Sequence, residues 1–132
     1  MPGTELLEHS DVKTVLCFII ISLFSTTVYS QIYPDHQVDS TLRYGINQII
    51  LQNYSDAQKT FSCLETNYPH LPLGKIYLAA VKIAQSYDYG TGYDEPVIDS
   101  LLTLAKEQSY DLINQNDNIW NRYFLSLSEV KK

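Results

Sequence analysis

Residues 41–69 read TLRYGINQIILQNYSDAQKTFSCLETNYP, and this stretch decides the fold. In each of its halves, apolar residues recur at three- and four-residue steps, which is the spacing of one face of an α-helix. The polar turn at residues 53–56 separates the halves and offers Ser55 or Asp56 as the N-cap of the second helix. Pro69 ends that helix. We therefore expect two packed helices. One face of the first contains Leu42, Ile46, Ile49 and Ile50, and the second buries Ala57, Phe61 and Leu64.

The glycine of the first helix needs a reason, because glycine inside a helix costs about 1 kcal/mol relative to alanine. Gly45 is therefore expected where a second helix approaches closely. Five residues of this stretch resemble one tetratricopeptide (TPR) repeat, which has a small residue on its first helix, a small residue and an aromatic on its second, and a closing proline. These residues are Tyr44, Gly45, Ala57, Phe61 and Pro69. The chain departs from the family at Thr41, where Trp is favoured, and at Gln48, where an aromatic is favoured.

The same pattern returns after 34 residues, which is the period of that repeat. Every apolar or small position of the first helix falls on another apolar or small residue. The pairs are Leu42 and Ile76, Tyr44 and Leu78, Gly45 and Ala79, Ile46 and Ala80, Ile49 and Ile83, and Ile50 and Ala84. We therefore expect residues 73–87 to form the first helix of a second repeat. The alternative is two ordinary amphipathic helices that share a period by chance. The resemblance is clear over residues 38–87.

The resemblance implies an all-α fold of TPR-like antiparallel helix hairpins, a short α-solenoid. In that family the first helices form a concave surface that binds a protein or peptide partner. By the resemblance, the residues that line this surface are Leu42, Ile46, Ile49, Ile76, Ala80 and Ile83. With only two repeats, it is equally open that these residues form ordinary core beneath another helix.

Residues 97–114 are expected to form the second helix of repeat two. Its apolar stripe is expected at Val97, Leu101, Leu104, Ala105 and Leu112, flanked by Ile98 and Leu102. The preceding loop, residues 87–95, is rich in tyrosine, glycine and acidic residues and is longer than the turn of the family. Its oxygen atoms could hold a sugar or a calcium ion, but the spacing matches no calcium loop. The plainer interpretation is an elongated turn with Asp94 as N-cap and Pro96 in the first helical turn.

The last expected helix begins at Ile119 and has a broad apolar face with no helix after it. That face contains Ile119, Trp120, Tyr123, Phe124 and Leu127. Repeat arrays need about three repeats and usually end in a polar capping helix. We therefore expect residues 38–132 to be an incomplete helical domain: a fragment, a frameshifted product or one half of an oligomer. We expect self-association through residues 119–130.

The N-terminal residues 1–30 are interpreted as a signal peptide. Val15–Phe24 is the most hydrophobic run, with a length that suits a signal-peptide core and is short for a spanning helix. Cleavage before Gln31 fits the small-x-small rule and leaves residues 31–37 as a linker. Asp39 or Ser40 can then cap the first repeat helix. Because the first eleven residues carry no basic residue, we hypothesise that translation starts at Val12. An uncleaved membrane anchor and a buried helix are the alternatives.

The composition restricts the classes of function. A net charge of −6 without a basic stripe argues against nucleic-acid binding. His36 and His70 are expected in surface loops without a metal cluster, and Cys63 is expected as a small buried thiol. The sequence offers no nucleophile–base pair and no phosphate-binding loop, so neither an enzyme nor a cofactor is expected.

We therefore expect a non-enzymatic protein–protein interaction scaffold, exported to the bacterial envelope as a periplasmic or secreted protein. The membrane is expected to matter only through the signal segment. Two alternatives stay open. One is a glycan- or small-ligand-binding envelope protein that uses loop 87–95, and the other is the N-terminal part of a larger protein.

Overall fold

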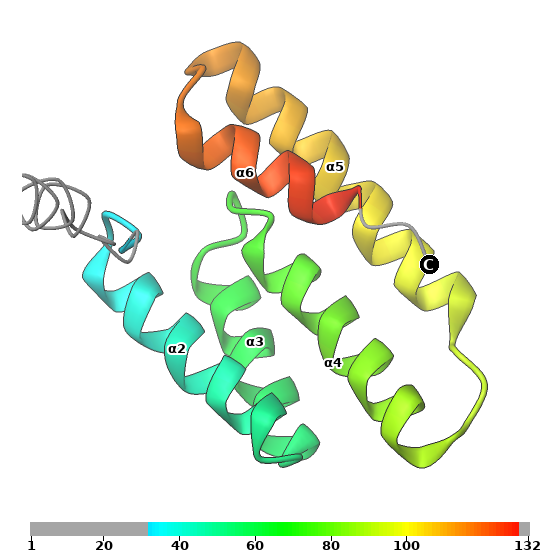
Figure 1. Ribbon diagram of the computed structural model, residues 1–132. Helices are drawn as coiled ribbons and strands as arrows, with labels where there is room; N and C mark the ends of the chain where they lie inside the picture. The colour runs from blue at the N-terminus through cyan, green and yellow to red at the C-terminus, as the bar shows by residue number, and fades with distance from the viewer. Residues whose placement is uncertain (1–31, 130–132) are drawn as a thin grey trace, which may run out of the picture. The chain divides into compact units, whose positions relative to one another are not determined.

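The computed structural model describes residues 32–129, and Figure 1 shows their arrangement. The expected signal peptide and the proposed start at Val12 lie outside the described residues. Five helices make up the fold: α2 (His36–Ile50), α3 (Tyr54–Asn67), α4 (Leu73–Tyr89), α5 (Glu95–Gln115) and α6 (Ile119–Ser128). No strand occurs between residues 32 and 129, so the prediction of an all-α fold is confirmed.

Each helix packs against the next one along the chain, and α6 also contacts α4. In Figure 1, α2, α4 and α6 run in broadly the same direction, while α3 and α5 run in the opposite direction. This is the expected series of antiparallel helix hairpins. The helix expected at 73–87 is α4, which continues for two more residues.

Gly45 lies where α2 and α3 approach each other closely, as its position predicted. It is buried, and a Cβ atom built on it would lie 2.4 Å from Cζ of Phe61. The Phe61 ring is fully buried and stacks on Tyr77 of α4, with ring centroids 5.0 Å apart. The ring therefore has little freedom to move away. Ala57 and Leu64 are also buried, as expected.

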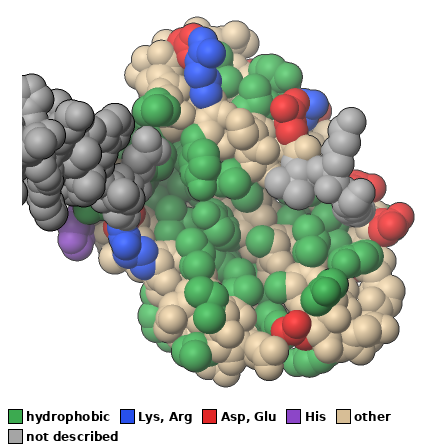
Figure 2. All heavy atoms as spheres, viewed as in Figure 1, with side chains coloured by type: hydrophobic (Ala, Val, Ile, Leu, Met, Phe, Trp, Pro, Cys, Tyr) green, Lys and Arg blue, Asp and Glu red, His purple; other side chains and the backbone are tan. Residues whose placement is uncertain are grey.

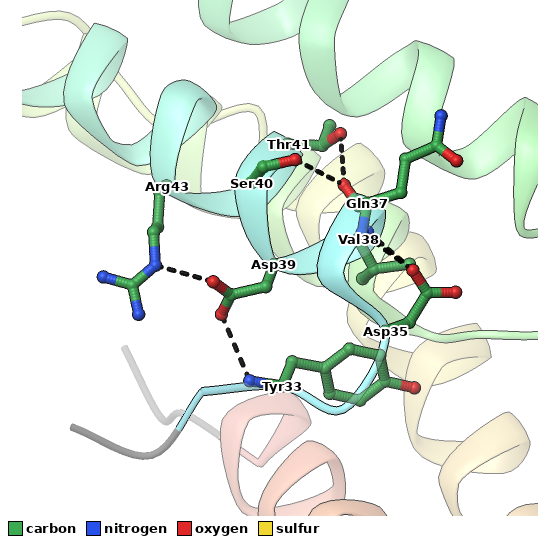
Figure 3. A network of polar contacts seen from close by, with 8 residues as sticks. All are labelled: Tyr33, Asp35, Gln37, Val38, Asp39, Ser40, Thr41 and Arg43. Carbon is green, nitrogen blue, oxygen red and sulfur yellow. Dashed lines mark hydrogen bonds and ion pairs between the residues drawn. The ribbon is translucent and has the colours of Figure 1, made fainter. Parts of the chain in front are cut away.

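Helix α2 begins at His36, within the expected linker, and neither Asp39 nor Ser40 is its N-cap. The cap is Asp35, whose Oδ1 accepts hydrogen bonds from the backbone N–H groups of Gln37 at 2.9 Å and Val38 at 3.1 Å (Figure 3). The earlier start places the Val38 side chain in the core, where it is fully buried.

Asp39 has a different role in the first turn of α2. Its Oδ2 accepts a hydrogen bond from Nε of Arg43 at 2.7 Å, and its Oδ1 accepts one from the backbone N–H of Tyr33 at 3.1 Å (Figure 3). The bond from Arg43 is the main reason that the pKa of Asp39 is lowered. Asp39 therefore fixes the residues that lead into α2. The Tyr33 ring in turn contacts α6, at centroid distances of 5.3 Å from Trp120 and 5.9 Å from Phe124.

Helix α3 also starts earlier than expected, so Ser55 and Asp56 are not its N-cap. The cap position is Asn53. Its side-chain Nδ2 donates to Oε1 of Gln48 at 3.0 Å, and its backbone N–H donates to the Gln48 carbonyl at 2.8 Å. Gln48, which replaces an aromatic of the TPR pattern, is buried and holds the turn between the two helices.

The buried face of α5 differs from the expected stripe. Ile98, Ala105 and Ser109 are fully buried, whereas Val97 and Leu104 are 39% and 45% exposed. The rotation of α5 is set by its contacts with α4 and α6, which the sequence pattern alone does not specify. Asp94 is the N-cap and Pro96 lies in the first turn, as predicted, but the helix begins at Glu95, two residues before the expected range.

The expectation that Cys63 is buried is wrong, because its side chain is exposed. Successive helical residues are rotated by about 100°, so Cys63 lies roughly opposite Phe61 on α3. His36 and His70 are exposed, as expected.

Candidate binding groove

An apolar pocket of about 660 Å³ lies between α2, α4, α5 and α6 and is open to solvent. We call it the groove. Helix α4 forms most of its wall, and Figure 2 shows hydrophobic side chains gathered along the middle of this face. The groove is lined by Ile49, Ile50, Gln52, Tyr54, Ile76, Tyr77, Ala79, Ala80, Ile83, Ala84, Tyr87, Asp88, Leu102 and Leu127.

Four of the six residues expected on the concave surface line the groove. They are Ile49, Ile76, Ala80 and Ile83. The other two, Leu42 and Ile46, are half-buried and pack against the hydrophobic core instead. The structure thus brings Ile49 at the end of α2 together with one face of α4 at the groove. Leu42 and Ile46, earlier in α2, pack on the core.

Residues that the sequence analysis missed complete the groove. Ala84, Tyr87 and Asp88 continue the predicted face of α4 at four-residue steps from Ala80, Ile83 and Ala84, so helical spacing alone could have found them. Leu102 of α5 and Leu127 of α6 close the opposite side. Their participation depends on how these helices pack on α4, and no local signal in the sequence indicates it.

One end of the groove is polar. The Tyr54 hydroxyl, at the start of α3, donates a short hydrogen bond to Oδ2 of Asp88, near the end of α4. This bond, together with burial and the charge of Asp88, raises the pKa of Tyr54 to about 12. The Tyr54 ring also contacts that of Tyr89 edge-on, with centroids 5.8 Å apart. Tyr54 therefore holds the Asp88 carboxylate at the rim of the groove.

The loop expected at 87–95 is shorter in the structure, residues 90–94, because α4 and α5 each extend into it. Helix α4 continues to Tyr89 and ends at Gly90, which adopts the left-handed conformation with φ of 62°. Asp94 forms an ion pair with Lys82 at 3.7 Å. Within residues 32–129, no three metal-binding side chains lie close enough together to hold a metal ion. In this segment, Asp88 thus bonds to Tyr54 of α3, whereas Asp94 pairs with Lys82 of α4.

The described helices include none that is both long enough and apolar enough to span a membrane. Comparison with known proteins gives no assignment, since no protein-family model, curated protein or solved structure matches the chain. Any functional assignment must therefore come from the groove itself.

Proposed function

We propose that this protein is a TPR-type interaction scaffold that binds the apolar face of a protein or peptide partner in the groove. The observation that carries the proposal is the groove's position. It lies on the first helices of successive hairpins, α2 and α4, and contains four residues that the repeat pattern assigns to partner binding. Export to the bacterial envelope is part of the proposal and rests on the hydrophobic run Val15–Phe24 and the cleavage pattern before Gln31.

The dimensions of the groove suit a helical peptide. Its lining on α4 extends from Ile76 to Asp88, which is about 18 Å at 1.5 Å per residue. That length matches roughly three turns of a bound helix, about twelve residues. Such a helix presents apolar anchors at three- and four-residue steps to a hydrophobic groove. The pocket volume of about 660 Å³ would receive those side chains, not the backbone of the partner.

Two leucines on α5 provide a matched test. Leu102 lines the groove, whereas Leu104, two residues later, is exposed and lies outside it. A phage-displayed library of random twelve-residue peptides should yield binders of the full chain and of Leu104→Asp. Leu102→Asp should lose them, because a charge in the groove opposes apolar contact. Circular dichroism must show equal helical content in all three proteins.

Ile49→Asp and Ile83→Asp extend the test to α2 and α4. Both residues are half-buried groove residues, so binding should be lost while helical content is kept. Equal binding by the Leu102→Asp and Leu104→Asp proteins would contradict the proposal. Unfolding of both isoleucine variants would mean that these residues act as core.

A further inference from the structure

The polar end of the groove carries concentrated negative charge. Helices α2 and α4 end there, since Ile50 and Asp88 line the same pocket, while α3 begins there at Tyr54 and its N-terminus offsets part of the negative charge. The C-terminus of a helix carries roughly half a negative charge, and a basic residue in the last turn normally offsets it. Neither α2 nor α4 has a basic residue in its last turn. Asp88 instead adds a full carboxylate to the last turn of α4.

The Asp88 carboxylate is available to a ligand. It is exposed and is the one charged side chain among the described residues of the groove. The Tyr54 hydroxyl donates to Oδ2 of Asp88, and no side chain or backbone group within residues 32–129 donates to Oδ1 of Asp88. The nearby Lys82 forms its ion pair with Asp94. The ring of Tyr87, 78% exposed, also lines this end and offers a face that attracts cations.

We propose that the ligand of the groove is a basic amphipathic peptide segment, whose apolar face fills the groove and whose Lys or Arg side chain binds Asp88. The inference rests on the proposed function and specifies its partner. A cation at this end would be attracted chiefly by the Asp88 carboxylate, because the N-terminus of α3 offsets part of the charge of the α2 and α4 C-termini. An acidic segment would be repelled by the same carboxylate and would be disfavoured.

The test is the composition of peptides selected from the random twelve-residue library. Peptides selected on the full chain should be enriched in Lys and Arg over the unselected library. Exchange of the enriched Lys or Arg for Glu in a synthetic copy should weaken binding roughly fivefold, the upper range for a partly exposed ion pair. The loss should shrink at high salt, because salt screens exposed charges.

Three variants separate Asp88 from the general acidity of the chain. Asp88→Asn should remove the Lys and Arg enrichment while apolar residues are still selected. Asp111→Asn, on the exposed surface of α5 outside the groove, removes the same charge and should leave the enrichment unchanged. Tyr54→Phe removes the bond that holds the Asp88 carboxylate in place but keeps its charge, so the enrichment should weaken without being lost.

The outcomes distinguish the two proposals. The role of Asp88 would be overturned if the selected peptides show no enrichment in Lys and Arg, or if that enrichment survives Asp88→Asn. The groove would then remain a binding site. Failure to select any peptide that depends on Leu102 would overturn the groove, and the basic partner with it.

Discussion

The Tyr54 hydroxyl and the Asp88 carboxylate form a hydrogen bond between residues 34 positions apart, which is one repeat period of the sequence pattern. The bond joins the first residue of α3 to the last turn of α4. It therefore fixes the distance between α3 and α4 at the polar end of the groove, where both residues are part of the lining.

This bond makes a prediction about alkaline pH. The pKa of Tyr54 is raised from 10.0 to about 12, mainly by Asp88, so folding favours the neutral phenol. The stabilisation is fully present below pH 10 and is lost as the pH rises through about 12. Burial also raises the pKa values of Tyr33 and Tyr77, so absorbance titration of tyrosinate should show several late-titrating groups, one of which is absent from Tyr54→Phe. That group should move to lower pH in Asp88→Asn.

Tyr110→Phe is the control for this titration, because Tyr110 is exposed on α5 and far from the bond in sequence. It should keep the late group that Tyr54→Phe removes. If Tyr54→Phe removes no late group, the prediction for Tyr54 is wrong.

The contact between Gly45 and Phe61 makes a prediction about stability. In Gly45→Ala, the added Cβ would lie 2.4 Å from Cζ of the stacked and buried Phe61 ring. The helices must separate, so we expect a loss of about 1–3 kcal/mol in unfolding free energy. Gly92→Ala is the control, since a Cβ there meets nothing within 4 Å. Urea unfolding followed by circular dichroism measures the unfolding free energy of both variants. Equal losses in Gly45→Ala and Gly92→Ala would rule out the steric explanation.

The sequence predicted those features of the fold that depend on spacing within a helix or between repeats. The glycine at position 45 indicated a close helix contact, and the shift of 34 residues located α4. Some aligned positions have similar environments, since Gly45 and Ala79 are both buried and Ile49 and Ile83 both line the groove. Others differ, since Leu42 and Ile46 do not line the groove, whereas their counterparts Ile76 and Ala80 do. These agreements arise because local periodicity determines which face of a helix is buried.

The features that were missed depend on contacts between distant residues. Asp35, Asp39 and Ser40 are all good N-cap residues. The choice of Asp35 follows from Tyr33, because Asp39 accepts a hydrogen bond from the Tyr33 backbone and the Tyr33 ring packs on α6. Leu102 and Leu127 reach the groove only because of how α5 and α6 pack on α4. Cys63 is different, since its position opposite Phe61 could have been read from helical spacing.

The contact of Tyr33 with α6 predicts a change that fluorescence can detect. Trp120 is the only tryptophan of the chain, and its ring meets that of Tyr33 edge-on. Tyr33→Leu keeps apolar bulk but removes the aromatic pair, so we expect a loss of about 0.5–1.5 kcal/mol in stability. Trp120 emission should shift to longer wavelength as solvent reaches the ring. Tyr44→Leu, at an exposed position on α2, should leave the emission unchanged.

The last prediction concerns self-association through α6. This helix buries Phe124 and is held to α5 by Asn121, whose Nδ2 donates to the carbonyls of Leu112 at 3.2 Å and Asn116 at 2.7 Å. Ile119 and Tyr123 are left 63% and 46% exposed. Neighbouring exposed apolar side chains of this kind commonly mark an interaction surface. We therefore predict that the protein self-associates at micromolar concentration.

Sedimentation of the full chain tests this prediction with a double variant, Ile119→Lys with Tyr123→Lys. Both side chains are exposed, so the fold should survive, while two added positive charges at the surface should shift the protein towards monomer. Leu104→Lys adds a charge at a comparably exposed leucine of α5 and should leave association unchanged. If the unmodified protein sediments as a stable monomer, α6 already caps the helix array and the prediction is wrong. If Leu104→Lys dissociates the assembly as well as the double variant does, α6 is not the surface through which the copies meet.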